Sequence, residues 1–344
     1  MVYGCRRLCS TTDEDYALRP TKTMLYGRRR WRTSPRGNGA ADSIPQHTRG
    51  DGLYIQTNYH THCTFCDGKN TAEEVAQKAA ELGLAVLGFS SHAAWPFGTE
   101  WHLQPREYGT YLGEIRRLQN IYTGTMEILA GFEAEYIPAL TLPEKALYAK
   151  FKPDYVIGSV HYIHSDHSEK LKDAGVPHFF AVDGSIEELS CGIQRHFGGD
   201  GKKAVQTYFA FERDMVQSCN FDIIGHADLI RKRNRELRFF DEADDWYRRE
   251  LKATAKAIAQ SGKVAEINTG GMSRAGLLSP YPSAAFLELL RKYDVPLTLN
   301  SDSHEAKTLT DFFDTGIQSA LAAGYGELWY LSGGSWKNQK INTA

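Results

Sequence analysis

The sequence predicts an α/β fold in which about seven strand–helix units close into a single barrel. From residue 53 onward, short apolar runs alternate with helical patterns, which is typical of βα units around a parallel sheet. No linker rich in proline, glycine or serine interrupts the chain after residue 50, so residues 51–344 are expected to form one domain. Ionisable residues also follow the predicted strands at one end, where the loops of such a barrel meet.

Seven runs have the length and apolar character of buried strands. In chain order they are LYIQTNYH (53–60), AVLGFS (85–90), EILAGFE (127–133), DYVIGSV (154–160), FDIIGH (221–226), KVAEINTG (263–270) and PLTLNSD (296–302). The run ELWYLS (327–332) is a possible eighth strand.

The first helix between these strands has clear end signals. Thr71 and Glu74 form the sequence signature of a capping box, and Gly83 stands where a helix end favours a left-handed residue. Similar helical patterns are PREYGTYLGEIRRLQ (105–119), KKAVQTYFAFERDMVQ (202–217), DEADDWYRRELKATAKAIAQSG (241–262) and SAAFLELLRKY (283–293).

The composition predicts a soluble, intracellular protein, which we expect in the cytoplasm. The 344-residue chain is 42% hydrophobic, enough for a large core, and its formal net charge is −2. This charge gives no reason to expect nucleic acid or a membrane as a partner. No apolar run approaches the roughly 20 residues that span a bilayer, and six scattered cysteines do not suggest a disulfide framework.

The first 50 residues differ from the rest of the chain in charge. They contain ten arginines or lysines and four acids, a net charge of +6, which leaves −8 for the remainder. Apolar residues are few and neither a strand nor a helix period is present, so we expect a disordered basic extension over residues 1–50. An organelle presequence, or a reading frame extended upstream of Met24, is an alternative.

The stretch HTHCTFCD (60–67) raises the question of metal binding. Cys63 and Cys66 form a CxxC pair, but no second CxxC or HxxxH follows at the spacing of a zinc finger. His60 and His62 lie two apart, so they share one face of an extended strand. A catalytic metal site therefore depends on partners elsewhere in the chain.

Those partners follow the other predicted strands, because six of the seven runs end in histidine or carboxylate residues. Each residue alone could be an ordinary hydrogen-bonded residue or a helix cap. Together they would face one centre, where unpaired ionisable groups are unfavourable unless something positive holds them. A cluster of divalent metals is the simplest such partner, with the candidate ligands His60, His62, Asp67, His92, Glu133, His161, His226, Asp302 and His304.

The number and type of these candidates indicate the metals and their chemistry. Six imidazoles and three carboxylates exceed what one tetrahedral zinc ion uses, so we expect two to three divalent ions, with a carboxylate such as Glu133 bridging them. Nitrogen and oxygen ligands without thiolate favour zinc, manganese or iron. Such a cluster is typical of hydrolases, because it activates water and polarises a phosphoryl oxygen.

The ordered motifs HTH, SSHA, GFEAEY, GSVH, GHAD and SDSH resemble those of the PHP (polymerase and histidinol phosphatase) superfamily. Within it, GFEAEYIP, GSVHYI and EINTGGMSRAG are most similar to monofunctional histidinol-phosphatases. The resemblance extends from about residue 53 to about residue 325, and it implies a distorted (β/α)7 barrel of the TIM-like type with a trinuclear centre built from the nine candidates. Many relatives carry histidine where this chain has Asp67, so the identity of the metals is left open.

The resemblance implies an activity, the hydrolysis of L-histidinol phosphate to L-histidinol and phosphate in histidine biosynthesis. The expected catalytic residues are Glu133, Asp302 and His304, with metal-activated water as the nucleophile. Asp302 or a metal-bound water would protonate the leaving alkoxide. The oligomeric state is left open.

Residues on the rim loops are candidates for substrate binding. Arg231, Lys232 and Arg274 follow two strand ends and could contact phosphate, although solvated surface cations are an equal alternative. Glu135 could bind the ammonium or imidazole of the substrate, or support Glu133. Histidines 102, 164, 167 and 178 lie in two insertions and are expected at the surface.

Three other functions are compatible with parts of this pattern. A PHP phosphoesterase acting on nucleotides would share the centre, but long nucleic acid would need a basic groove that the net charge of −8 after residue 50 does not favour. An amidohydrolase also begins with HxH on a barrel, but it usually has a carboxylated lysine where this chain offers Glu133. A regulatory metal-binding protein has no need of the full ligand set.

Overall fold

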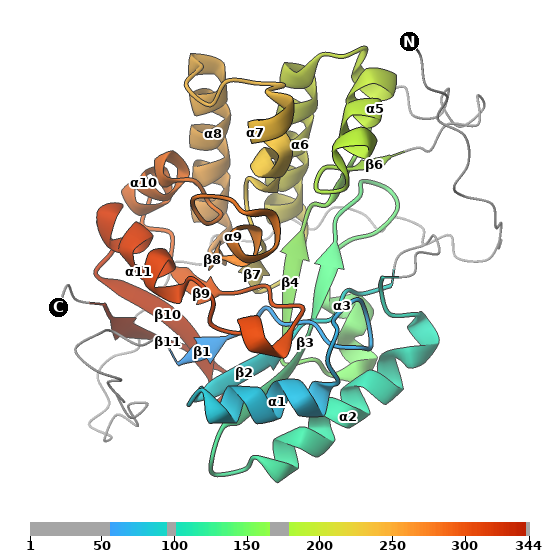
Figure 1. Ribbon diagram of the computed structural model, residues 1–344, viewed down its shortest axis with the longest axis vertical. Coiled ribbons are helices and arrows are strands. Elements are labelled where there is room, and N and C mark those ends of the chain that lie inside the picture. The colour runs from blue at the N-terminus through green and yellow to red at the C-terminus, as the bar shows by residue number, and fades with distance from the viewer. Residues whose placement is uncertain (1–55, 95–100, 166–178, 342–344) are drawn as a thin grey trace.

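The computed structural model describes residues 56–94, 101–165 and 179–341 (Figure 1). The predicted basic extension over residues 1–50 lies outside the described residues, and so do His167 and His178. Among the described residues, no helix has both the length and the apolar character needed to cross a membrane.

Seven parallel strands form the predicted barrel, and each of the seven apolar runs contributes one. In order around the sheet they are β1 (Thr57–Asn58), β2 (Val86–Phe89), β3 (Glu127–Glu135), β4 (Tyr155–Ser159), β7 (Ile223–Ile224), β8 (Val264–Asn268) and β9 (Leu297–Asn300).

The first and last strands approach each other and nearly close the barrel. Just beyond β1 and β9, Thr61 and Ser303 form an isolated parallel bridge. The amide of His62 donates to the carbonyl of Ser303 at 2.8 Å, and the amide of Ser303 donates to the carbonyl of His60 at 3.2 Å. The residues that complete the barrel therefore alternate with predicted metal ligands.

Helices surround the strands, with α5 to α8 together on one side and α1 and α2 on the opposite side in Figure 1. The α-helices are α1 (Ala72–Glu81), α2 (Tyr108–Ile121), α3 (Lys145–Tyr148), α5 (Ile186–Phe197), α6 (Gly201–Ser218), α7 (Asn234–Leu237), α8 (Asp245–Ser261), α9 (Gly270–Ala275), α10 (Ala284–Lys292) and α11 (Phe313–Ala322). The 3₁₀ helices in the described parts of the chain are η1 (Pro105–Glu107), η2 (Ala149–Phe151), η3 (Leu229–Arg233) and η4 (Ala306–Thr308).

The ends of α1 confirm the sequence signals. The hydroxyl of Thr71 accepts from the amide of Glu74, and the carboxylate of Glu74 accepts from the amide of Thr71, so the predicted capping box is present. Gly83 follows the helix with a φ of 76°, a conformation that glycine adopts without a steric penalty.

The possible eighth strand is present, but it lies outside the parallel sheet of the barrel. Glu327–Ser332 forms β10, which pairs antiparallel with β11 (Ser335–Lys340) through a two-residue turn at Gly333 and Gly334. Both glycines have positive φ, as tight hairpin turns between twisted strands require. The GG dipeptide was therefore a hairpin signal.

This β10–β11 hairpin packs against an apolar cluster of barrel residues. The hydroxyl of Tyr59 donates to the carbonyl of Leu331 at 3.0 Å and accepts from its amide at 2.9 Å. The cluster comprises Tyr59, Val86, Leu129, Tyr155, Ile157, Ile223, Tyr330 and Leu331, with Trp336 packed against it. Because β2, β3, β4 and β7 and the residue that follows β1 all contribute, this part of the barrel is a filled core, and the polar site lies toward the other ends of the strands.

Candidate metal centre

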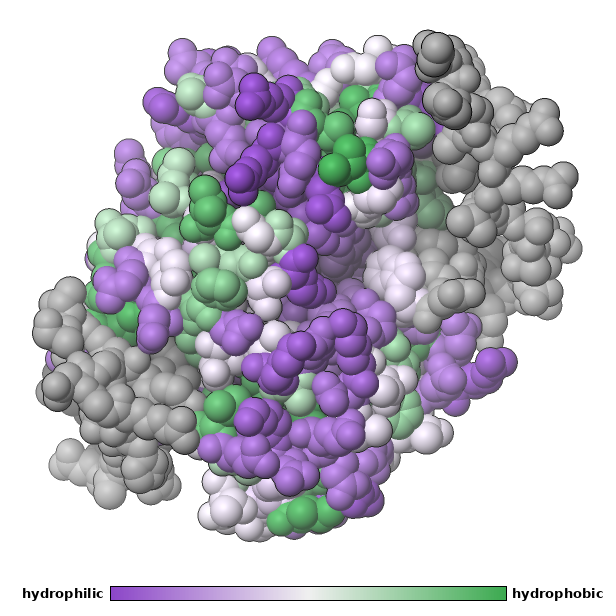
Figure 2. All heavy atoms as spheres, viewed as in Figure 1, coloured by the Kyte–Doolittle hydropathy of each residue, from purple (hydrophilic) through white to green (hydrophobic). Residues whose placement is uncertain are grey.

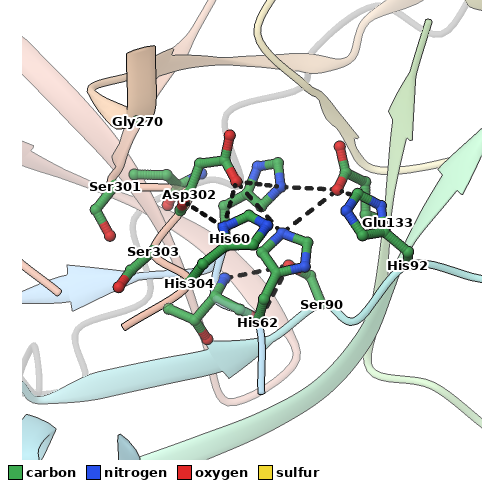
Figure 3. Close-up of polar contacts among 12 residues, drawn as sticks. His60, His62, Ser90, His92, Glu133, Gly270, Ser301, Asp302, Ser303 and His304 are labelled. Atoms are coloured by element: carbon green, nitrogen blue, oxygen red, sulfur yellow. Dashed lines mark hydrogen bonds and ion pairs between the residues drawn. The ribbon is translucent and has the colours of Figure 1, made fainter. Parts of the chain in front are cut away.

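All nine predicted ligands converge at the C-terminal ends of the strands. They form four groups, and within each group the ligand atoms lie within 4.8 Å of one another. Figure 3 shows six of them pointing toward one another, Glu133 from β3 and the others from the segments that follow β1, β2 and β9: His60, His62, His92, Asp302 and His304. The groups are His62–Asp67–His92–His304, His60–His226–Asp302, His60–His62–Glu133 and Glu133–His161–His226.

Glu133, on β3, lies at the middle of this arrangement with its side chain almost wholly buried. Its two carboxylate oxygens face different imidazoles, so one side chain reaches two sides of the centre. Nitrogens of five histidines lie within 3.5 Å of these oxygens: His60 at 3.1 Å, His62 at 3.5 Å and His92 at 3.0 Å on Oε2, His226 at 2.9 Å and His161 at 3.4 Å on Oε1.

The other two carboxylates lie on opposite sides of His304. Its Nε2 is 3.1 Å from Oδ2 of Asp67, and its Nδ1 is 3.6 Å from Oδ1 of Asp302. Asp302 also faces Nε2 of His62 at 3.3 Å and Nε2 of His60 at 3.5 Å. Asp67 is the more exposed carboxylate, at 31% against 7% for Asp302.

The donor atoms fit divalent metal ions. Nε2 of His60, Nε2 of His62 and Oε2 of Glu133 are buried atoms without a hydrogen-bond partner, and they point at the same centre. Buried polar atoms are normally satisfied, so several orphaned lone pairs in one place call for a cation. The set of imidazole nitrogens and carboxylate oxygens suits zinc, manganese or iron.

Glu266, in the middle of β8, holds His60 from behind and was missed in the sequence. Both of its carboxylate oxygens lie 3.0 Å from Nδ1 of His60, and Oε1 also accepts from the amide of His226 at 2.8 Å. The side-chain amides of Asn268 and Asn300 donate to it at 2.7 and 2.8 Å. Nε2 of His60 is thereby left to face the centre. The available signal was a lone acid inside an apolar strand, VAEIN.

Two other imidazoles have partners of different strength. Nδ1 of His161 lies 2.6 Å from Oε2 of Glu135, whose Oε1 accepts from the backbone amide of His161. Nδ1 of His62 lies 3.5 Å from the sulfur of Cys66, a weak hydrogen-bonding atom. The CxxC motif is therefore adjacent to the centre but belongs to none of its four ligand groups.

The charges of the centre shift the pKa values of its members strongly. Burial disfavours the imidazolium of His161, but the charges of Glu135 and Glu133 outweigh it and raise its pKa to about 10. Burial, assisted by the charge of His304, lowers the pKa of His62 to about 4. Despite burial, the neighbouring histidines hold the pKa of Glu133 well below its usual range. The site therefore keeps an ionised carboxylate in its interior at neutral pH.

The backbone at Asp302 is fitted closely to the site. Its φ of 49° is unusual for a residue other than glycine, and it turns the chain directly after β9. Gly270 lies against it, because a Cβ atom at that position would come within 2.9 Å of the Cβ of Asp302. Any larger residue at position 270 would displace the carboxylate.

Comparisons with known proteins agree with this geometry. Residues 58–270, more than half of the chain, match the model of the PHP domain family. The chain belongs to the PHP family. It is 30% identical over 262 residues to the "Probable histidinol-phosphatase" of Schizosaccharomyces pombe, a match that covers 71% of this chain and 79% of that protein. It is 23% identical over 259 residues to the histidinol-phosphatase of Bacillus subtilis, covering 72% and 92%.

A solved PHP structure confirms the fold. The histidinol phosphate phosphatase of Lactococcus lactis, crystallised with zinc, L-histidinol and phosphate, superposes with a TM-score of 0.58. It shares 22% sequence identity and covers 82% of this chain and 98% of its own. The predicted distorted (β/α)7 barrel is thus confirmed by both the strand order and this likeness.

Of the predicted phosphate-binding cations, Arg274 lies on the PHP centre itself. Its guanidinium donates to Oδ2 of Asp302 at 2.5 Å and contacts the ring nitrogens of His304 at 2.7 and 2.9 Å. Lys232 lies nearby and pairs with Asp183 at 3.1 Å. A role for these two cations in substrate binding stays a prediction.

The contacts of Arg231 and Glu135 differ from the predicted ones. The guanidinium of Arg231 is buried and donates to the carbonyl of Pro280 and the hydroxyl of Ser279, so it anchors a loop and is not free for phosphate. Glu135 is buried with both oxygens engaged by His161, so we assign it support of that imidazole in place of a substrate contact.

Among the insertion histidines within the described residues, His102 was assigned wrongly. It is 5% exposed, and its Nδ1 lies 3.1 Å from the carbonyl of Leu103. His164 is half-buried and its ring lies 5.1 Å from that of Phe211. Neighbouring Trp101 contacts the rings of two of the predicted ligands, so this insertion borders the centre.

Proposed function

We infer that this PHP protein is a metal-dependent phosphomonoesterase that hydrolyses L-histidinol phosphate to L-histidinol and phosphate. The observation that carries this inference is the convergence of nine nitrogen and oxygen ligands, with Arg274 beside them, on a barrel of the histidinol-phosphatase type. The L. lactis structure, which contains zinc together with L-histidinol and phosphate, supports the same substrate. Histidine biosynthesis is the corresponding pathway, and a cytoplasmic location stays a prediction.

We assign the metal positions from the ligand groups. The first position would use His62, Asp67, His92 and His304, and the second would use His60, His226 and Asp302. Glu133 would bridge toward a third, with His161 and His226. The bound ions would supply activated water and neutralise the charge of the phosphate oxygens.

The protein's own residues have complementary tasks in this mechanism. Arg274 would donate to phosphate oxygens, and a planar guanidinium fits two of them at once. Despite burial, the charges of Arg274 and His60 hold the pKa of Asp302 well below its usual range, so its carboxylate is ionised. So low a pKa makes Asp302 a weak base, and we propose that it would hold the proton of the attacking water only briefly before it returns that proton to the leaving alkoxide. Glu266 and Glu135 would fix the tautomers of His60 and His161.

The test is phosphate release from L-histidinol phosphate by the manganese- or zinc-loaded protein, beside a nucleotide panel and an aryl phosphate. Release from L-histidinol phosphate that is abolished in Glu133→Ala or His226→Ala would support the proposal. Activity confined to the nucleotides would be consistent with the proposed metal centre but would refute L-histidinol phosphate as the substrate. A protein that binds the metals and releases no phosphate would refute phosphatase function itself.

A further inference from the structure

A pair of short antiparallel strands places one more carboxylate beside the centre. Directly after His161, β5 (Tyr162–Ile163) pairs antiparallel with β6 (Phe180–Ala181). The amide of Val182 donates to the carbonyl of His161 at 2.8 Å. Asp183 is the next residue, so the backbone ties it to a predicted metal ligand although 22 positions separate them in sequence.

One of the two carboxylate oxygens of Asp183 accepts a hydrogen bond. Oδ2 accepts from Nζ of Lys232 at 3.1 Å, and the two side chains are 27% and 15% exposed. Within the described parts of the chain, Lys232 is the hydrogen-bond donor to this carboxylate, and no donor contacts its other oxygen, Oδ1. The lysine thus orients the carboxylate and leaves one oxygen for a ligand.

The charges of Asp183, the centre and Arg274 act on one another. Although burial opposes it, the charges of Lys232 and His161 hold the pKa of Asp183 below its usual range. Burial by itself lowers the pKa of Arg274, but the charges of Asp302, Asp67 and Asp183 outweigh burial, and the pKa of Arg274 is raised. Asp183 therefore lies within electrostatic range of both a predicted metal ligand and the predicted phosphate-binding arginine.

Aromatic side chains lie beside the histidines of the centre, because Trp101 contacts the rings of both His92 and His161. The ring of Trp101 is edge-on to that of His92 with centroids 4.9 Å apart, and it lies nearly parallel to Tyr162, at 13° and 6.2 Å. Phe179, which precedes β6, packs against Tyr162 at 5.3 Å. In Figure 2 the surface is hollowed near the middle of this face, beside α9, with hydrophilic residues along the rim.

We propose that Asp183 is a specificity-determining residue that binds the ammonium group of the substrate, with Trp101 beside the imidazole ring. This inference rests on the proposed function. The ammonium of L-histidinol phosphate is only two carbon atoms from the ester oxygen, so a carboxylate must lie close to the metal ligands to reach it. The flat ring of Trp101, beside His92 and His161, suits a planar heteroaromatic ring.

A rival role for the pair makes a different prediction. If Asp183 served only to aim Lys232 at the phosphate, its loss would weaken every phosphate ester alike. If Asp183 binds the ammonium, its loss weakens only substrates that carry that group. Comparison of substrates therefore separates the two roles.

The experiment measures kcat and KM of the wild type and Asp183→Asn with three esters. They are L-histidinol phosphate, the same compound without its amino group, and 4-nitrophenyl phosphate. A charge-assisted hydrogen bond predicts that KM for L-histidinol phosphate rises about tenfold to a hundredfold in Asp183→Asn. KM for the other two esters should stay within about twofold or fall, because Lys232 loses its partner. Equal losses with all three esters, or no loss with any, would overturn the proposal.

Two controls separate a specific effect of Asp183 from a general loss of activity. Asp294→Asn changes an exposed aspartate that pairs with Arg291 at the opposite end of β9, and it should leave all three KM values unchanged. In the wild type, L-histidinol should inhibit at a concentration about tenfold lower than its deaminated analogue. Equal inhibition would refute the proposal without any variant. A wild type without activity on L-histidinol phosphate would instead refute the proposed function on which this inference rests.

Discussion

Replacing Glu266 with glutamine tests whether the carboxylate behind His60 matters for metal binding. The substitution preserves shape and removes one acceptor oxygen and the charge. If the remaining oxygen keeps the bonds from the His226 amide and Asn268, the new amide group faces Nδ1 of His60 and the side chain of Asn300. The retained Oε1 still lies 3.0 Å from Nδ1 and can accept from it, but the amide group in place of Oε2 can only donate there, so part of the imidazole population moves its proton to Nε2, the nitrogen that faces the centre.

The expected loss follows from this change of tautomer. Partners behind metal-bound histidines typically contribute a factor of about 10 to 100 in metal affinity, which corresponds to about 1.4 to 2.8 kcal/mol. Because Glu266 also holds the backbone of His226, we expect Glu266→Gln to approach the upper end of that range. Loss of kcat should accompany the loss of metal.

The assay is competition with a chromophoric chelator, combined with metal analysis of the dialysed protein and kcat at saturating metal. Glu288→Gln is the matched control, because Glu288 is exposed on α10, and it should bind metals like the wild type. Wild-type affinity in Glu266→Gln would refute the reasoning. Unchanged affinity with reduced kcat would show that Glu266 acts on the reaction and not on metal retention.

Three further results are expected. Arg274→Ala should lower kcat/KM for L-histidinol phosphate about a hundredfold, with Arg274→Lys intermediate, while metal content stays unchanged; loss of metal in proportion would contradict a phosphate-binding role. Burial raises the pKa of Glu212 to about 8 from 4.5. The unfolded state therefore releases this proton between pH 4.5 and 8 while the folded state keeps it, so stability falls with rising pH by on the order of 1 kcal/mol per unit. Glu212→Gln should remove that slope in urea unfolding across the same range, and an unchanged slope would contradict it. Chelation should lower Tm by about 5 to 10 °C, reversibly on adding zinc or manganese, and Tm should fall in steps as the metal positions empty; an unchanged Tm would show that metal binding is uncoupled from folding.

The barrel and the nine candidate ligands were predictable because both leave local marks in the sequence. An apolar run locates a buried strand, and an ionisable residue just after it, such as His226 or Asp302, locates the rim. Parallel strands then bring these ends together whatever the detailed packing. The run ELWYLS was correctly expected to be a strand, but its apolar character could not tell a barrel strand from a hairpin strand.

Residues whose roles depend on side-chain direction were not predictable from position alone. Arg231 and Lys232 are adjacent in sequence, yet the first points into a buried network with Ser279 and the second pairs with Asp183. Asp183 follows no predicted strand, and its partner is 49 residues away. Glu266 lies inside an apolar run, which the sequence pattern alone predicts to be core. Each of these contacts is decided by tertiary structure.

The imidazoles of the centre differ in the groups that hold them, so the proposed metal positions should differ in strength. Carboxylates lie behind His60 and His161, and such partners raise the basicity of the ligand nitrogen. Nδ1 of His62 instead lies 3.5 Å from the Cys66 sulfur and 3.7 Å from Oδ1 of Asp67, and burial raises the pKa of that thiol, so it stays neutral. The position built on His62 also depends on Asp67, the most exposed of the three carboxylates. The solvent access of Asp67 and the weaker partner of His62 both lower the expected metal affinity of this position. It is therefore expected to exchange its metal first.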